Sequence, residues 1–115
     1  MPKAIKIVLQ LFGSFAIEAQ GARAIPLAVT SRRGRALIAY VAMQPRYRAS
    51  RQRLATLLWG DSGDVQARQS LRQCIASLRR DLRRVPGLFV ADRDSVGLSG
   101  QNLTVLKSDE FFVFF

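Results

Sequence analysis

Histidine is absent from the 115-residue sequence, and cysteine occurs once, as Cys74. Histidine is the commonest general base near neutral pH and the commonest metal ligand, so its absence excludes much ordinary catalysis. One cysteine can form neither an internal disulfide nor a thiolate metal cluster. We therefore predict no catalytic residues, no metal and no cofactor, a cytoplasmic location, and a cysteine that packs in the core.

Long apolar runs are lacking as well. No stretch of the sequence approaches the ~20 apolar residues that cross a bilayer, so we expect no membrane partner. The apolar residues near the N-terminus alternate with polar ones and lack a small-residue cleavage site, so we predict no signal peptide. A length of 115 residues, with 49% hydrophobic and 23% charged residues, is typical of one globular domain.

Acidic residues are few: eight Asp and Glu stand against eighteen Lys and Arg, for a formal net charge of +10. This imbalance favours a polyanionic partner, and nucleic acid is the first candidate. Eight arginines and no acid lie between Glu18 and Asp61, and six more arginines lie between Asp64 and Val85. Such a concentration of positive charge is typical of a phosphate-binding face.

The spacing of apolar residues predicts an α+β fold. Alternation across residues 4–29 predicts an antiparallel meander of three short strands. Helical spacing then predicts helices at about 32–43, from Ser50 to Trp59, and at 65–85, the first two with hydroxyl N-caps. We expect Leu54, Leu57 and Leu58 to face inward and Trp59 to fill the core between the last two helices. Two apolar runs, 88–90 and 96–98, predict a β-hairpin.

The helix predicted at 65–85 has a polar face opposite its apolar stripe. At about 100° per residue, that face carries Gln69, Arg72, Gln73, Ala76, Arg80 and Arg83. In the major groove, arginine pairs with guanine, and glutamine pairs with adenine. A small residue on the helix lets it sit deep in the groove. The face therefore indicates a DNA recognition helix, although the solvated face of any amphipathic helix has a similar composition.

Arg51 and Arg53 lie in the first turn of the second predicted helix, where the helix dipole disfavours cations. A DNA phosphate at this N-terminus would accept amide hydrogen bonds and pair with both arginines. The alternative interpretation is that Arg51 and Arg53 are surface charges that the helix tolerates.

Four motifs follow one another along these elements. They are Leu11-Phe12-Gly13, Arg35-Ala36-Leu37-Ile38-Ala39-Tyr40, Leu54-Ala55-Thr56-Leu57-Leu58-Trp59-Gly60-Asp61, and Ala67-Arg68-Gln69-Ser70-Leu71-Arg72-Gln73 leading into Leu78-Arg79-Arg80-Asp81-Leu82. Together they resemble the OmpR-type winged-helix DNA-binding domain, in the branch found at the N-terminus of SARP/BTAD-type bacterial transcriptional activators.

The resemblance implies a winged helix-turn-helix domain over 1–106, with a truncated tail at 107–115 that begins a missing effector domain. It also implies a recognition helix in the major groove, a C-terminal hairpin wing in the adjacent minor groove, and tandem binding on repeated half-sites. The expected base-contacting residues are Arg68, Gln69, Arg72, Gln73 and Arg80. The expected phosphate-contacting residues are Arg32, Arg33, Arg48, Arg51, Arg53, Arg79 and Arg83, and Arg93 lies at the tip of the wing.

The sequence departs from the family pattern in two places. Many relatives have acids where the second helix here begins with Arg51 and Arg53, and the usual glycine and tyrosine of the wing are replaced. Asp92 and Asp94 stand in the wing instead, and carboxylates beside a phosphate backbone are unfavourable.

We expect sequence-specific binding of double-stranded DNA in bacterial transcription regulation, without a catalytic role. The expected partners are double-stranded DNA, further copies of the chain on DNA, and RNA polymerase. Two alternatives remain open. A basic RNA-binding protein has the same charge, although single-stranded RNA is usually bound by exposed aromatics. A protein-interaction module of the same fold would bind DNA weakly and without sequence preference.

Overall fold

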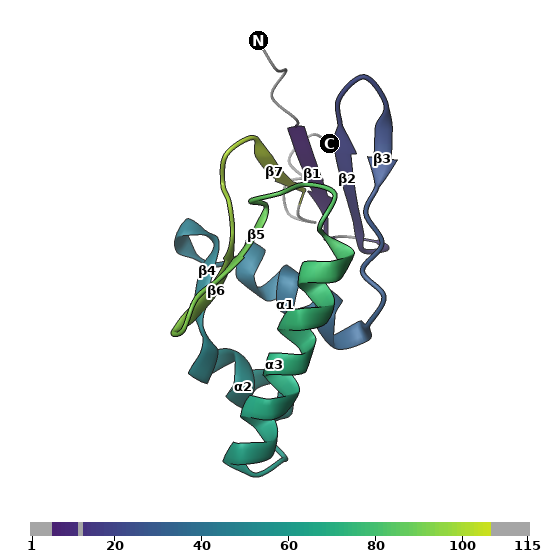
Figure 1. The fold of residues 1–115 in the computed structure, drawn as a ribbon. Helices are drawn as coiled ribbons and strands as arrows, with labels where there is room; N and C mark the ends of the chain where they lie inside the picture. Colours follow the sequence, from purple (N-terminus) through teal and green to yellow (C-terminus); the bar gives the residue numbers. More distant parts are fainter. Residues whose placement is uncertain (1–5, 12, 107–115) are drawn as a thin grey trace. The chain divides into compact units, whose positions relative to one another are not determined.

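The computed structural model describes residues 6–11 and 13–106, which fall into two compact units. One unit contains the residues up to Ala28 and those from Gly100 onward, and the other is Val29–Ser99. Figure 1 shows the helices and strands of both units. Phe12 of the first motif and the tail at 107–115 lie outside the described residues, so the expectation for the tail stays a prediction.

The first unit is a four-stranded sheet with the strand order β3-β2-β1-β7. β1 (Lys6–Gln10), β2 (Ala16–Gln20) and β3 (Ala24–Pro26) form the predicted antiparallel meander. Ile7 and Leu9 of β1 are buried opposite Ala19 and Ile17 of β2, so the alternation places one face of both strands in the core.

Two features of this sheet differ from the prediction. β3 ends at Pro26, three residues short of the predicted alternation, although the Leu27 N–H still donates to the Ile17 carbonyl oxygen at 2.9 Å. Proline is tolerated here because β3 is an edge strand. β7 (Leu103–Leu106) lies outside the predicted elements and pairs in parallel with β1, with Ile7 opposite Leu103.

The second unit combines three helices with a small sheet. α1 (Arg32–Ala42), α2 (Arg51–Trp59) and α3 (Asp64–Asp81) are the predicted helices, and β5 (Phe89–Ala91) and β6 (Ser95–Leu98) form the predicted hairpin. A 3-10 turn, η1 (Pro45–Tyr47), leads into β4 (Arg48–Ser50), which was not predicted and adds to β6. The described residues therefore form an α+β fold.

The N-caps of α1 and α2 are hydroxyl residues, as predicted, and both are serines. The Ser31 Oγ accepts a hydrogen bond of 2.8 Å from the Gly34 N–H, and the Ser50 Oγ accepts one of 3.0 Å from the Arg53 N–H. Each cap satisfies an amide that has no partner within its own helix.

α3 ends at Asp81, four residues before the predicted end. A residue before proline is pushed out of the helical conformation, and Val85 precedes Pro86. The chain leaves the helix through turns, in which the Val85 N–H donates to the Leu82 carbonyl at 3.2 Å. Arg83 therefore lies outside the helix whose face was predicted to carry it.

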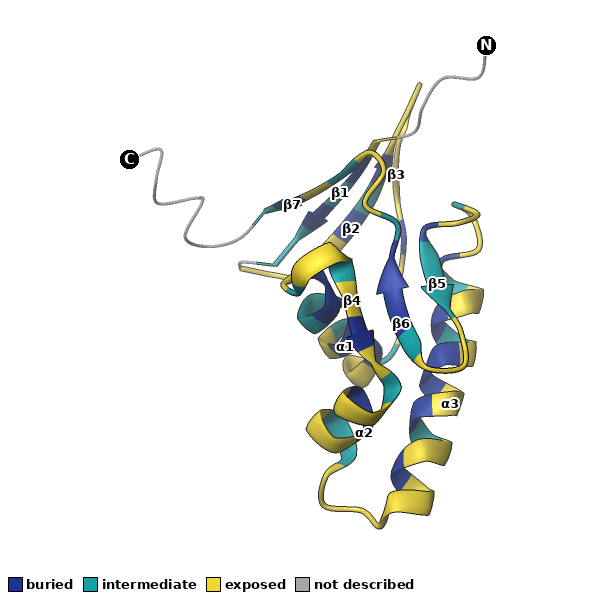
Figure 2. Ribbon diagram, turned by 90° about the vertical axis from the view of Figure 1, so that its left-hand side faces the viewer, coloured by how far each residue is buried: buried dark blue, intermediate teal, exposed yellow. Residues whose placement is uncertain are grey.

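Apolar side chains from all three helices and from β6 form the core of this unit. Figure 2 shows the buried residues of α3 on the side turned toward α2 and the hairpin. The most deeply buried side chains are Leu37, Ile38, Val41, Leu54, Leu71, Leu78 and Val96. None of the described helices is long and apolar enough to cross a membrane.

The prediction that Leu57 faces inward is wrong, because its side chain is 53% exposed. α2 buries Leu54 and Ala55 instead. At about 100° per residue, Leu57 lies roughly 110° from the centre of the side that packs inward, so it points to solvent.

Candidate nucleic-acid interface

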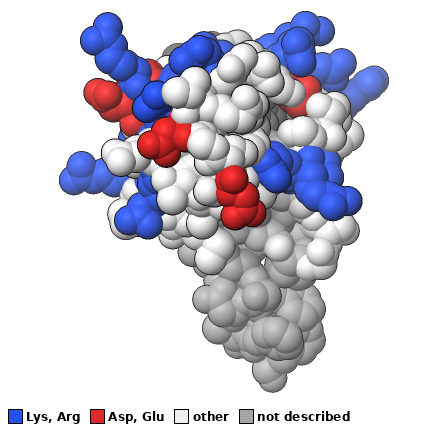
Figure 3. Space-filling view, turned by 90° about the horizontal axis from the view of Figure 1, so that it is seen from below, with Lys and Arg blue, Asp and Glu red and all other residues white. Residues whose placement is uncertain are grey.

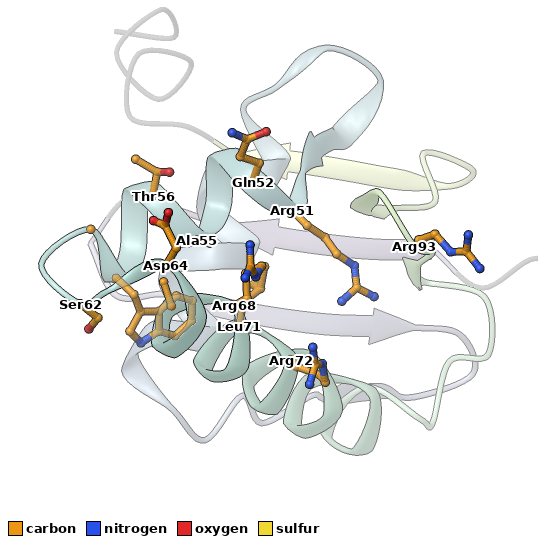
Figure 4. Close-up of a pocket in the computed structure, with 13 residues that line it drawn as sticks. Arg51, Gln52, Ala55, Thr56, Ser62, Asp64, Arg68, Leu71, Arg72 and Arg93 are labelled. Carbon is orange, nitrogen blue, oxygen red and sulfur yellow. The ribbon is translucent and has the colours of Figure 1, made fainter.

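A groove of about 580 Å³ lies between α2 and α3 and extends to the tip of the β5–β6 hairpin. We call it the arginine groove, because arginines from three elements line it: Arg51 of α2, Arg68 and Arg72 of α3, and Arg93 of the hairpin turn. Figure 4 shows Arg93 at one end of the groove and Asp64 toward the other, with Arg51 extending from α2 toward α3. The structure thus brings together four predicted DNA-contacting residues.

The predicted base-contacting residues of α3 lie on two different flanks. Arg68 and Arg72 line the arginine groove, whereas Gln69, Gln73 and Arg80 do not. At about 100° per residue, the two sets are centred roughly 100° apart around the helix axis. All five side chains are exposed.

Arg79 shows which flank of α3 faces the hairpin. Its side chain lies at nearly the same angle around the helix as Arg68 and Arg72. Its Nη2 donates a hydrogen bond of 3.0 Å to the carbonyl oxygen of Ala91 in β5. The groove flank of α3 therefore faces the hairpin, and the flank with Gln69 and Gln73 faces away from it.

Three further arginines use their guanidinium groups to hold the second unit together. Arg35 Nη1 donates to the Val29 carbonyl oxygen at 2.9 Å. Arg48 Nη1 donates to the Ser95 Oγ at 3.0 Å, and Arg51 Nε donates to the Asp92 carbonyl oxygen at 2.7 Å. Arg48, Arg51 and Arg79, all predicted to contact phosphates, thus have structural partners in the hairpin.

Other predicted DNA-contacting arginines have no hydrogen bond or ion pair from their guanidinium groups to another described residue. They are exposed and are therefore free to bind an external anion. These residues are Arg32, Arg53, Arg68, Arg72, Arg80, Arg83 and Arg93.

The hairpin turn is organised around the carboxylate of Asp92. Its Oδ1 accepts hydrogen bonds from the N–H groups of Asp94 at 2.9 Å and Ser95 at 2.8 Å, and its Oδ2 lies 3.7 Å from Arg48 Nη1. These two backbone hydrogen bonds lower the pKa of Asp92, with the nearby Arg48 guanidinium acting in the same direction. The charge of Asp92 is thus partly compensated within the protein.

The N-terminus of α2 has fewer free amides than an anion site would need. The Arg53 N–H donates to Ser50 Oγ, and the Arg51 N–H donates to the Asp94 carbonyl oxygen at 2.9 Å. Two amides of the first turn therefore have acceptors within the chain, and the exposed Arg53 guanidinium is the remaining strong donor for a phosphate there.

Trp59 is half-buried rather than enclosed in the core as predicted. The guanidinium carbon of Arg33 lies 5.2 Å from the centroid of its ring, within the range of a cation–π interaction. Trp59 is the last residue of α2 and lies roughly 90° from the centre of its buried side, so one ring face is left for Arg33.

Cys74 packs in the core as predicted, with 8% of its surface exposed. Burial raises the pKa of its thiol, and the guanidinium of Arg33 acts in the opposite direction. Within residues 6–11 and 13–106, no three Cys, Asp or Glu side chains come close enough to hold a metal ion.

Gln52 and Thr56 form part of the α2 wall of the arginine groove and were not among the predicted site residues. The two residues are four apart in the sequence, which places them on one face of a helix, and this spacing could have identified them as neighbours in a site.

The basic side chains on the face shown in Figure 3 do not form one continuous patch. On the face in Figure 3 they gather in several groups, with acidic side chains between them. A nucleic acid on this face would therefore be bound through separate contacts.

No protein-family model matches the chain, and no curated protein or solved structure shows significant similarity to it.

Proposed function

We propose that the chain is a winged helix-turn-helix domain of the OmpR/SARP type that binds double-stranded DNA sequence-specifically in bacterial transcription regulation. In this proposal α3 enters the major groove and the β5–β6 hairpin is the wing. The order of the helices and the hairpin supports this arrangement. Further copies of the chain in tandem on DNA, contact with RNA polymerase and a cytoplasmic location belong to the same proposal.

One observation supports it most strongly. The side of α3 opposite its buried stripe carries exposed Gln69, Gln73 and Arg80 around the small Ala76, and the arginine groove lies directly beside that side. Donors suited to base edges and cations suited to phosphates are thus adjacent, as duplex recognition requires.

The nature of the cations also favours a nucleic-acid partner. Every basic residue between Val29 and Ser99 is arginine. Arginine pairs with both phosphate and guanine through two parallel hydrogen bonds, which the ammonium group of lysine cannot do. Single-stranded RNA is usually bound by exposed aromatics, and the large hydrophobics most exposed among the described residues are Ile25, Met43, Leu57 and Val65.

The test is selection of bound duplexes from a random DNA pool at about physiological salt, followed by sequencing. We expect an enriched motif with half-sites about one helical turn apart. The matched control is a Gln69→Ala/Gln73→Ala variant, which we expect to fold and to bind without enriching that motif. A pool left unenriched by the wild-type chain would contradict the proposal.

A further inference from the structure

We infer that α3 divides its DNA contacts between two flanks: Arg68 and Arg72 bind backbone phosphates through the arginine groove, while Gln69, Gln73 and Arg80 read base edges. The inference rests on the proposed function and deepens it. It changes the role of Arg68 and Arg72, which the sequence placed among the base-contacting residues.

The direction of each side chain relative to the core is the first argument. The buried residues Ala67, Leu71, Cys74, Ile75 and Leu78 define the inward side of α3. At about 100° per residue, Gln69 and Arg80 lie opposite that side, roughly 170° from its centre, whereas Arg68 and Arg72 lie only about 70° to 110° from it.

The position of base edges and phosphates around a helix in the major groove is the second argument. Base edges form the floor of the groove and are reached by side chains that point straight away from the protein. Phosphates line the rim and are reached by side chains on the flanks. This places Gln69 and Arg80 at the floor, and Arg68 and Arg72 at the rim.

The other arginines of the arginine groove also support binding of a phosphate backbone there. Arg51 and Arg93 line the groove from α2 and from the hairpin, on the same side of α3 as Arg68 and Arg72. A DNA strand carries one phosphate per 3.4 Å of helix axis, so an extended row of cations from three elements matches a backbone better than a single base. The Arg79 contact with Ala91 confirms that this flank of α3 faces the hairpin.

The guanidinium groups of Arg68, Arg72 and Arg93 have no hydrogen bond or ion pair with another described residue. Asp64 is the one acid in the groove lining, toward the end away from Arg93. A phosphate bound between Arg72 and Arg93 would therefore displace no internal partner of these two side chains.

The experiment measures the affinity of single variants for the selected operator, and for its single-base changes, over a series of salt concentrations. We expect Arg72→Ala and Arg68→Ala to weaken binding to all these duplexes by a similar factor and to lower the salt slope by about one each. Lysine supplies a point charge that a phosphate accepts, so Arg72→Lys restores most of the affinity.

Gln69→Ala and Gln73→Ala are the matched variants on the other flank. We expect each to leave the salt slope unchanged and to lose about 5- to 150-fold of discrimination at one base pair. All four alanine variants replace exposed side chains, so we expect each to fold, and circular dichroism checks this.

Two results overturn the inference in distinguishable ways. If Arg72→Ala abolishes the preference at one base pair and Arg72→Lys does not restore binding, Arg72 reads a base, and the proposed function stands without this division of roles. If the wild-type chain enriches no sequence, the proposed function fails and the inference fails with it.

Discussion

Arg51 donates a hydrogen bond of 2.7 Å from its guanidinium Nε to the carbonyl oxygen of Asp92. Its backbone N–H also donates to the Asp94 carbonyl oxygen, so one residue of α2 holds the hairpin turn on both sides of Arg93. The position of Arg93 in the arginine groove therefore depends on the start of α2. A half-buried cation in the first helical turn, which the helix dipole disfavours, here forms hydrogen bonds that hold the hairpin turn.

Replacing Arg51 with alanine is expected to loosen the hairpin turn. The loss of one exposed hydrogen bond should lower the free energy of unfolding by about 0.5 to 1.5 kcal/mol, measured by urea denaturation. The amides of Asp94 and Ser95 should also exchange faster with deuterium, because the turn opens more often. Arg53→Ala is the control, since no hydrogen bond joins its guanidinium to another described residue. Equal exchange rates in both variants would contradict the structural role of Arg51.

Asp92 makes the stability of the hairpin depend on pH. Its pKa is lowered in the folded protein, chiefly by hydrogen bonds from the Asp94 and Ser95 amides. Its contribution is therefore present above the unfolded-state pKa, about 3.9, and is lost as the pH falls through the lower folded value. The Tm of the wild type should exceed that of Asp92→Asn at neutral pH, and the difference should shrink as the pH falls from about 4 through the lower folded-state pKa.

The control for this pH dependence is Asp94→Asn, which removes the same charge two residues away. The Asp94 carboxylate has no hydrogen bond to another described residue. We expect its Tm at neutral pH to stay close to that of the wild type. A constant difference in Tm between Asp92→Asn and wild type from pH 7 to pH 3 would show that the carboxylate of Asp92 has no special role.

Local patterns in the sequence predicted the helices and the hairpin well. Ser31 and Ser50 mark helix starts because capping depends on residues only three apart. The buried stripe of α3 could be read from its spacing, since a helix repeats the same geometry at every turn. The end of α3 was missed because Leu82 is buried and continues that stripe beyond the last helical residue.

Features that depend on distant residues could not be predicted in the same way. β4 has three residues and acquires its structure by pairing with β6, and β7 pairs with β1 from the opposite end of the described chain. The angle between Arg68 and Gln69 around the helix axis follows from the sequence. The flank of α3 that faces the hairpin does not. That relation required the contact between Arg79 and Ala91.

Gly97 allows β4 to pass close to β6. A Cβ atom at this position would lie 2.5 Å from the Tyr47 carbonyl oxygen and 2.8 Å from the Cγ of Arg48. The first of these atoms belongs to the backbone of Tyr47, the last residue of η1, so the chain where η1 joins β4 would have to move. We expect Gly97→Ala to lower the free energy of unfolding by about 1 to 3 kcal/mol, as overpacking usually does.

Chemical denaturation measures this loss, and Gly21→Ala is the control. No heavy atom lies within 4 Å of a Cβ built at Gly21, in the turn between β2 and β3. The control should therefore change stability much less. A Gly97→Ala protein as stable as the wild type would show that β4 adjusts without cost.

The contact between Arg33 and Trp59 joins the first turn of α1 to the end of α2 and can be followed by fluorescence. Trp59 is the single tryptophan of the sequence, so its emission reports this site alone. Arg33→Ala removes the cation over the ring and exposes that face to water. We expect a red-shifted emission maximum and a loss of about 0.5 to 1 kcal/mol of stability, the usual strength of an exposed cation–π pair. Arg32→Ala removes a neighbouring exposed arginine and should leave the emission unchanged. The same spectrum in both variants would mean that Arg33 does not cover the ring in solution.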